Sequence, residues 1–375
     1  MVYLMGTSSP DRRMQPYLDP DSATVIRNQA GASEEAGQLH PQVLNLIYTQ
    51  KLFKLYLPAH LGGIDIDLPS LLGLLEAVAE ADGSTGWVVT LCSGASWFAG
   101  FWPETLVREV FNRPDVCVTG SGAASGTATQ TAGGYVVEGA WPYATGALHA
   151  THFTANCRIL APDGLPVLTE SGQPLIRSFL FTADQVERLP TWSAVGMVGT
   201  GSHGFAVHRQ TVSEERSFDI NSPLQQTINV GNYPFLQLAE ATLAVNFSGM
   251  ARHFLALIGE RVDSRLRSGA FTAEQARYVE QAMRAQRDLF MNHRGLFYEV
   301  VAESCRELDH SGEVTESTLR QVSNCSRQLA HTAREVVDRL FPYGGLETVK
   351  SGTELGRVWR DIHTASGHSL LTFPF

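Results

Sequence analysis

The sequence predicts an α+β protein in three parts. An N-terminal helical domain covers residues 1–112, a central antiparallel β-barrel or sandwich covers 113–220, and a C-terminal helical bundle covers 221–375. Apolar helical patterns give way near residue 113 to alternating segments rich in Gly and Thr, and they return near residue 221. A chain of 375 residues suits two or three domains, and a hydrophobic content of 43% is ample for a buried core.

Two stretches predict the helices of the first part. "QVLNLIYTQKLFKLYLPAHLGG" reads as a helix that the glycine pair Gly62-Gly63 stops. "LPSLLGLLEAVAEADGSTGWVVTLCSGASWFAGFW" is apolar almost all round, which indicates helices buried on several faces. The interruption "ADGSTG" predicts a turn between two such helices.

The middle part shows the period of two that is typical of strands. In "THFTANCRIL", Phe153 and Cys157 point to one face, and Thr154 and Arg158 point to the other. The pair before "YVVEGAW", Gly133-Gly134, predicts a hairpin, and "LIRSFLFT" and "GFAVHRQTV" predict further strands. The run "GAWPYATGALHATHF" between two strand-like segments leaves two alternatives open, a hairpin with ordinary packing residues or a wall of a cofactor site.

In the last part the helical pattern returns, and three helices can be delimited in it. Thr272 and Gln275 form a capping-box pattern that opens "AEQARYVEQAMRAQRDLFMNHRGLFYEVVAESC". The next helix, "STLRQVSNCSRQLAHTAREVVDRLF", carries an apolar stripe at steps of three and four residues, and a final helix covers roughly 353–366. The stripe consists of Leu319, Val322, Leu329, Ala330, Ala333, Val336, Val337 and Leu340. Long apolar helices of this kind pack as antiparallel neighbours.

Charge and cysteine content exclude several classes of protein. A net charge of −10, without a block of basic residues, argues against nucleic acid or a membrane surface as partner. No segment reaches 18 consecutive apolar residues, and "MVYLMGTSSPDRR" does not read as a secretion signal, so we expect a cytoplasmic protein without a membrane span. The five cysteines lack CxxC spacing and are odd in number, so we expect neither a metal site nor a disulfide framework.

Four stretches, in this order along the chain, resemble one known group of proteins. "LPAHLGGIDIDLPSLLGLLEAVAEADGSTGW" looks like the N-terminal signature of acyl-CoA dehydrogenase-fold proteins. "GGYVVEGAWPYATGALHA", "WSAVGMVGTGSHGFAV" and "LGRVWRDIHTASGH" resemble motifs of the two-component, group D flavin-dependent monooxygenases on that fold. Each stretch is weak alone, whereas the four together are specific.

The resemblance implies a fold, a reaction and partners. The fold would be acyl-CoA dehydrogenase-like, with a C-terminal four-helix bundle, a homotetramer, and a flavin between the β domain and the bundle. A separate flavin reductase would supply reduced FMN or FAD, and O2 would give a C4a-hydroperoxide that oxidises a small aromatic, polyketide-like or amine substrate. No GxGxxG motif follows a strand here, which fits delivery of the reduced flavin from outside.

The same resemblance assigns roles to individual residues. Thr145 takes the place of a serine whose hydroxyl faces flavin N5, and His368 and His149 are the candidate catalytic histidines. The predicted cofactor-binding residues, taken from the three motifs and from "GMARHF", are Trp141, Thr145, Gly146, Thr200, Gly201, Ser202, Arg252, Arg357 and Trp359. For each the sequence leaves a structural role open: Trp141 could be a core residue, Gly201 part of a plain turn, and Arg360 and Asp361 an ion pair.

Two departures from the family pattern keep other functions open. Many aromatic hydroxylases of the family carry a histidine after the "STGW" turn, where this chain has Ala95, so ordinary phenol hydroxylation is in doubt. Many acyl-CoA dehydrogenases carry a glutamate base shortly after the R-D pair, whereas no carboxylate follows Asp361 in "RDIHTASGHSLL". The alternatives to a monooxygenase are an acyl-CoA dehydrogenase-like FAD oxidoreductase and a non-catalytic paralogue that binds a flavin or another ligand.

Overall fold

The structure is a computed structural model that describes residues 18–350 and 352–373. Residues 1–13, which do not read as a secretion signal, lie outside the described residues. The helices are α1 Pro20–Ala36, α2 Pro41–Thr49, α3 Leu68–Ala81, α4 Gly83–Ser96, α5 Glu104–Phe111, α6 Phe235–Arg267, α7 Ala273–Ser311, α8 Glu316–Leu340 and α9 Glu354–Ala365. The strands are β1 Val118–Thr131, β2 Gly134–Trp141, β3 His152–Leu160, β4 Ile176–Thr182, β5 Glu187–Leu189, β6 Gly204–Ser213 and β7 Ser217–Phe218.

The first part is helical, as predicted, and Asp82 marks its sharpest turn. α3 ends at Ala81 and α4 begins at Gly83, so the expected turn shrinks to one residue. Asp82 caps α4, because its carboxylate accepts a hydrogen bond from the backbone N–H of Thr85 at 2.8 Å. The prediction that one helix continues to Gly62-Gly63 is wrong, since α2 ends at Thr49 and short 3-10 turns follow it.

The central part is one seven-stranded sheet, in the order β5-β6-β2-β1-β3-β4-β7. The predicted hairpin at Gly133-Gly134 is confirmed, because Thr131 pairs with Gly134 between β1 and β2. The prediction of a purely antiparallel sheet is wrong at one pair, since β1 and β3 are parallel. The segment 142–151 therefore does not close a hairpin: it leaves β2, crosses the end of β1 and enters β3 on the far side of β1.

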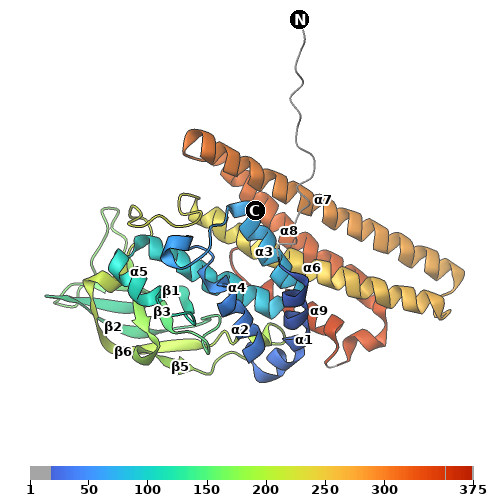
Figure 1. Ribbon diagram of the computed structural model, residues 1–375, viewed down its shortest axis with the longest axis horizontal. Coiled ribbons are helices and arrows are strands. Elements are labelled where there is room, and N and C mark those ends of the chain that lie inside the picture. The colour runs from blue at the N-terminus through green and yellow to red at the C-terminus, as the bar shows by residue number, and fades with distance from the viewer. Residues whose placement is uncertain (1–17, 351, 374–375) are drawn as a thin grey trace, which may run out of the picture.

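The last part is a helical bundle built around α6. α6 packs against α3 on one side and α8 on another, and α7 packs against α8. The capping box at Thr272 and Gln275 is confirmed at the start of α7. The predicted stripe of α8 is buried from Val322 onward, whereas Leu319 is only half-buried. In Figure 1, the C-terminal end of α6 and the start of α7 project together away from the sheet, and α4 lies between the sheet and the bundle.

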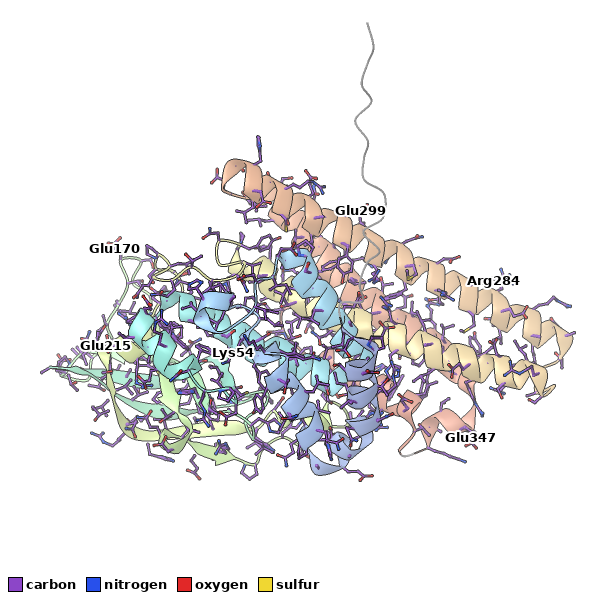
Figure 2. The ribbon with its side chains drawn as sticks, viewed as in Figure 1. Lys54, Glu170, Glu215, Arg284, Glu299 and Glu347 are labelled. Atoms are coloured by element: carbon purple, nitrogen blue, oxygen red, sulfur yellow. The ribbon has the colours of Figure 1, made fainter. Side chains whose placement is uncertain are left out.

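Two of the helices of the bundle have opposite surroundings. Within the described part of the chain, α6 alone is long and apolar enough to cross a membrane by length and composition, and 78% of that window is buried, as in the core helix of a soluble domain. α7 buries only a narrow stripe, and charged residues such as Arg284 and Glu299 stand out from it (Figure 2). The predicted three-part α+β fold is thus confirmed, while the domain boundaries at 112/113 and 220/221 stay predictions.

Candidate functional site

Two of the motif stretches meet at a cluster of hydroxyl groups. Thr145 lies in the connection between β2 and β3, and Thr200 and Ser202 lie in the loop before β6. The hydroxyl oxygens of Thr145 and Ser202 are 3.1 Å apart, and those of Ser202 and Thr200 are 2.7 Å apart. The backbone N–H of Gly146 also donates to the carbonyl of Thr200 at 2.9 Å. All of these side chains are buried, so sequence positions 55 residues apart form one local site.

Counting protons gives this chain of hydroxyls a direction. A hydroxyl has one proton to donate. Thr200 donates its proton to the carbonyl of Met197 at 2.7 Å, because a carbonyl oxygen can only accept. Ser202 must then donate to Thr200, and Thr145 must donate to Ser202. The hydroxyl oxygen of Thr145 is left with acceptor capacity for a further donor.

Helix α4 contacts the turn at Thr145. The thiol of Cys92 donates to the carbonyl of Thr145 at 3.4 Å, and the hydroxyl of Thr119 donates to the same carbonyl. Gly146 has a φ of 72°, and a Cβ there would lie 2.9 Å from the sulfur of Cys92. Both observations favour glycine at this position, and they hold the turn close against α4.

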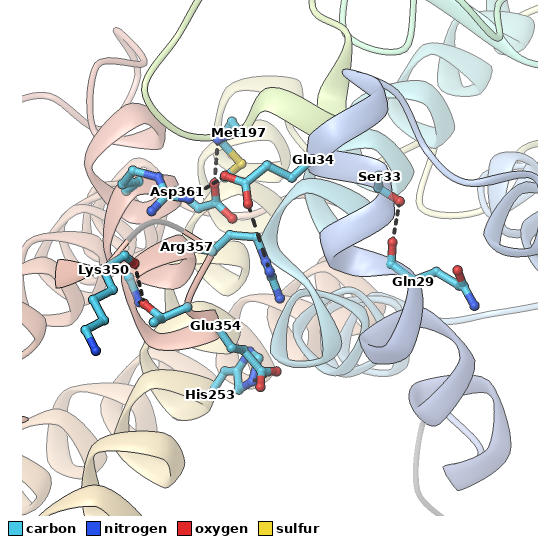
Figure 3. A network of polar contacts seen from close by, with 12 residues as sticks. Gln29, Ser33, Glu34, Met197, His253, Lys350, Glu354, Arg357 and Asp361 are labelled. Atoms are coloured by element: carbon cyan, nitrogen blue, oxygen red, sulfur yellow. Dashed lines mark hydrogen bonds and ion pairs between the residues drawn. The ribbon is translucent and has the colours of Figure 1, made fainter. Parts of the chain in front are cut away.

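The C-terminal motif reaches the same loop from α9. The backbone N–H of Met197 donates a hydrogen bond to Asp361, as Figure 3 shows. The guanidinium of Arg360 pairs with Glu34 on α1, and Arg357 lies 4.0 Å from the same carboxylate. The suggested ion pair between Arg360 and Asp361 is therefore wrong. Arg360 pairs with Glu34 instead, and Asp361 accepts a hydrogen bond from the backbone N–H of Met197.

Asp361 has an unusual electrostatic environment. It is 2% exposed, and burial raises the pKa of its carboxyl group to about 7, with the nearby Asp82 adding to the rise. Asp82 is also buried, at the start of α4. The carboxyl group of Asp361 thus changes its charge close to neutral pH.

The structure gives His149 a structural partner. Its Nε2 accepts a hydrogen bond from the backbone N–H of Leu39 at 3.1 Å, which links the β domain to the loop after α1. The neutral ring must then carry its proton on Nδ1. Burial lowers the pKa of His149 to about 4, so the ring is neutral at pH 7. A catalytic role for His149 stays a prediction, and its Nε2 is already engaged.

We expect His149→Gln to flatten the acid dependence of stability. The folded-state pKa lies below the unfolded value of 6.5, so between pH 6.5 and about 4 the unfolded chain binds more protons. Stability is fully present above pH 6.5 and is lost as the pH falls toward 4, by about 2 kcal/mol at pH 5 for this residue. Urea unfolding at pH 7.5 and pH 5 measures the loss of unfolding free energy between the two pH values. This loss should be smaller in His149→Gln than in the wild type by about 2 kcal/mol. His60→Gln, at an exposed position, should keep the wild-type difference, and an unchanged loss in His149→Gln would contradict the assignment.

His368 lies just after α9 against α4. Its ring makes an edge contact with Trp87, with ring centres 5.7 Å apart. Its Nδ1 accepts from the backbone N–H of Leu370 at 3.4 Å, and burial lowers its pKa, so the neutral ring presents Nε2–H as a donor. Ala95 is buried two turns further along α4 and offers no proton-exchanging group. The catalytic role of His368 stays a prediction, with hydrogen-bond donation favoured by this tautomer.

The side chains of three other predicted residues have partners outside the hydroxyl cluster. Trp141 is 1% exposed, stacks on Phe205 and donates from Nε1 to a β3 carbonyl at 2.9 Å, which favours its alternative role in the core. Arg252 lies 3.0 Å from Glu80 and 3.6 Å from Glu76, so carboxylates of this chain already neutralise it. Trp359 packs on Phe341 and donates to a carboxylate of α8. Cofactor contacts for these three stay predictions.

Sequence reasoning missed Glu34, Cys92 and Met197 as parts of this site. Glu34 lies at the end of an ordinary polar helix, and Cys92 reads as a small core residue. Met197 matters through its backbone rather than its side chain. None carries a signal in the sequence, because Glu34 and Cys92 act through contacts distant along the chain and Met197 acts through its backbone atoms.

The described part of the chain has no cluster of side chains that could bind a metal ion. Across residues 18–350 and 352–373, no three His, Cys, Asp or Glu side chains gather as metal ligands. All five cysteines are free, and Cys92, Cys117 and Cys157 are buried. Burial raises the pKa of the Cys157 thiol to about 12, which makes it unreactive at neutral pH.

Known proteins resemble this chain over most of its length. Residues 241–373 match the family described as "Acyl-CoA dehydrogenase, C-terminal domain". The oxygenase subunit HsaA of a flavin-dependent monooxygenase from Rhodococcus jostii (strain RHA1) is 28% identical over 361 residues, which cover 92% of this chain and 91% of that protein. Indole-3-acetate monooxygenase from Pseudomonas putida is 23% identical over 349 residues, with coverage of 92% and 88%.

Solved structures share the fold. The crystal structure of 3-HSA hydroxylase from Rhodococcus sp. RHA1 has a TM-score of 0.85 at 23% identity and covers 94% of this chain and 92% of its own. XiaF from Streptomyces sp., in complex with FADH2 and glycerol, has a TM-score of 0.80 at 23% identity, with coverage of 94% and 89%. These findings confirm the resemblance that the four motif stretches indicated: over most of its length the chain is similar to flavin-dependent monooxygenases, and it shares its fold with the solved structures of such proteins.

Proposed function

We propose that this chain is the oxygenase component of a two-component flavin-dependent monooxygenase. It takes reduced FMN or FAD from a separate reductase and, with O2, oxidises a small aromatic substrate. The observation that carries the proposal is the joining of the Thr145 turn, the 197–202 loop and α9 in one site, in a chain whose oxygenase relative HsaA matches 92% of its length. A homotetramer and a cytoplasmic location remain predictions from the sequence.

The surroundings of the hydroxyl cluster fit a flavin ring. Thr145 and Ser202 supply buried hydroxyls. Tyr143 and Leu148, in the same connection as Thr145, and Val195, shortly before the 197–202 loop, are apolar side chains that are 71%, 40% and 72% exposed. Apolar walls with a few well-placed polar groups are typical of cofactor sites. Thr145, Gly146 and Gly201 would hold the ring, Ser202 would orient the Thr145 hydroxyl, and a bound reduced flavin would supply the electrons that activate O2.

The chain's own contribution is positioning, exclusion of water and hydrogen bonding. The neutral His368 offers an Nε2–H to a substrate or a reacting oxygen. Ala95 adds no base on α4. Substrates that must lose a proton early therefore have no base at that position, which favours rings already activated by electron-donating groups.

The direct test combines the purified chain, reduced flavin and isotopic oxygen. FMN or FAD is reduced under nitrogen and titrated into the protein, and the complex is then mixed with ¹⁸O2 and a panel of phenols, indoles and arylamines, with catalase present. We expect tight binding of one reduced flavin and one ¹⁸O atom in the product, with the other atom leaving as water. Omission of the reductant is the control. Absence of reduced-flavin binding, or product labelled from water, would contradict the proposal.

A further inference from the structure

The carboxyl group of Asp361 sits where α9 meets the loop of the hydroxyl cluster. We propose that Asp361 is a positioning residue of the site: by holding the backbone of Met197 it fixes residues 198–202 and, through them, the hydroxyl of Thr145. Its role in flavin binding rests on the proposed function, whereas its hold on the loop rests on the structure alone. Figure 3 shows the contact among the charged side chains of α1 and α9.

Met197 needs an external hold because of its backbone. Its φ is 53°, a left-handed conformation that residues other than glycine rarely adopt. Such a residue persists when its surroundings over-determine it. The Met197 carbonyl accepts from the indole N–H of Trp192 at 3.0 Å and from the Thr200 hydroxyl at 2.7 Å. The Met197 N–H donates to Asp361, so loss of that carboxyl group removes the hydrogen bond of the peptide group before Met197 and leaves those of the peptide group after it.

Gly196 lets the loop pack directly against the backbone of α9. A Cβ at Gly196 would lie 2.2 Å from the backbone oxygen of Arg360, so no side chain fits between loop and helix. This close approach brings the next N–H, that of Met197, onto Asp361. Asp361 thus holds the N–H of Met197, and hydrogen bonds run on from the carbonyl of the same residue through Thr200 and Ser202 to Thr145.

The charges that face Asp361 come from three elements. Asp82 at the start of α4 and Glu34 on α1 oppose its ionisation, while Arg357 on α9 and the Met197 N–H favour it. α6 contributes the uncharged Met250, whose sulfur lies beside Gly83 next to the carboxyl group. Burial sets the balance and places the pKa at about 7. An ionised carboxylate makes the stronger acceptor, so the hold on Met197 tightens as the pH rises through neutrality.

The test measures amide hydrogen exchange in the flavin-free, full-length chain. Asp361→Ala removes the acceptor, and Asp361→Asn keeps an acceptor oxygen but cannot ionise. Asp338→Ala is the matched control, because Asp338 anchors another face of α9 through His363 at 2.9 Å. We expect exchange at residues 197–202 to rise at least tenfold in Asp361→Ala and to stay at the wild-type level in Asp338→Ala.

A pH series separates positioning from simple packing. After correction for intrinsic exchange, the wild-type Met197 amide should be better protected at pH 8 than at pH 6, whereas Asp361→Asn should show wild-type protection at pH 6 and no such rise. Wild-type exchange at 197–202 in Asp361→Ala would overturn the inference. Equal loosening in Asp361→Asn and Asp361→Ala, or in Asp338→Ala, would overturn it as well, because the acceptor atom would then not matter.

Reduced-flavin titration links the loop to function. We expect Asp361→Ala to raise the dissociation constant about tenfold, and Asp361→Asn to stay within about twofold of the wild type at pH 6. Faster loop exchange with unchanged affinity would overturn the role in flavin binding. If the wild-type chain binds no reduced flavin, the proposed function fails, and the exchange data still decide whether Asp361 holds the loop.

Discussion

Arg294→Met should lower the free energy of unfolding by about 3–5 kcal/mol, the range for breaking a buried ion pair. Glu76 on α3 is 2% exposed, and the Nε of Arg294 on α7 donates to one of its oxygens at 2.7 Å. The second guanidinium nitrogen and the hydroxyl of Tyr298 contact the other oxygen, the hydroxyl at 3.0 Å. Methionine keeps the apolar length of the side chain but leaves the carboxylate without its main partner.

The charge of Glu76 is the cause, and a second variant tests it. Glu76→Gln removes the charge, so Glu76→Gln with Arg294→Met should be more stable than Arg294→Met alone. Arg284→Met, at an exposed position on the same helix, should change stability by less than about 0.5 kcal/mol (Figure 2). Urea unfolding measures all four proteins. A loss below about 1 kcal/mol in Arg294→Met would show that Arg252, 3.6 Å away, suffices for Glu76.

Local patterns predicted most elements but not how they meet. The capping box at Thr272, the alternation in β3 and the stripe of α8 depend on neighbouring residues, and the structure confirms them. The 33-residue helix α6 is buried on nearly all sides between Leu238 and Phe254, so periodicity offered no face by which to delimit that part. The parallel pairing of β1 with β3 depends on where the 142–151 segment crosses, which neither strand encodes by itself.

The site divides in the same way. The motifs pointed to Thr145, Thr200 and Ser202, and the structure brings these three hydroxyls together. The contacts that hold them come through backbone atoms of Met197 and through Asp361, which lies 164 positions further along the chain. Side-chain type says little about a backbone carbonyl that accepts or a backbone N–H that donates. Motifs in a sequence thus predict the polar side chains of a site more readily than the backbone hydrogen bonds that orient them.

Thr145→Ala should weaken reduced-flavin binding about tenfold and slow product formation on the order of a hundredfold. The first effect is that of a buried hydrogen bond lost without replacement, and the second reflects the sensitivity of turnover to small displacements of the reacting groups. Thr145→Ser keeps the hydroxyl and should retain most of both. Anaerobic titration gives the affinity, and product yield per O2 consumed gives the efficiency of the oxidation.

Ser202→Ala decides whether the hydroxyls act as one chain. In the wild type, the Thr145 hydroxyl donates its hydrogen bond to Ser202, so it can only accept a hydrogen bond from the flavin. Without the Ser202 hydroxyl, Thr145 can donate outward, so affinity should shift from reduced flavin, which carries ring N–H groups, toward oxidised flavin, whose corresponding nitrogens accept. The ratio of the two dissociation constants should change several-fold. Thr145→Ala combined with Ser202→Ala should bind no worse than Thr145→Ala alone, because Ser202 acts on the flavin only through Thr145. Additive losses, or equal weakening toward both redox states, would show instead that each hydroxyl contributes only to packing.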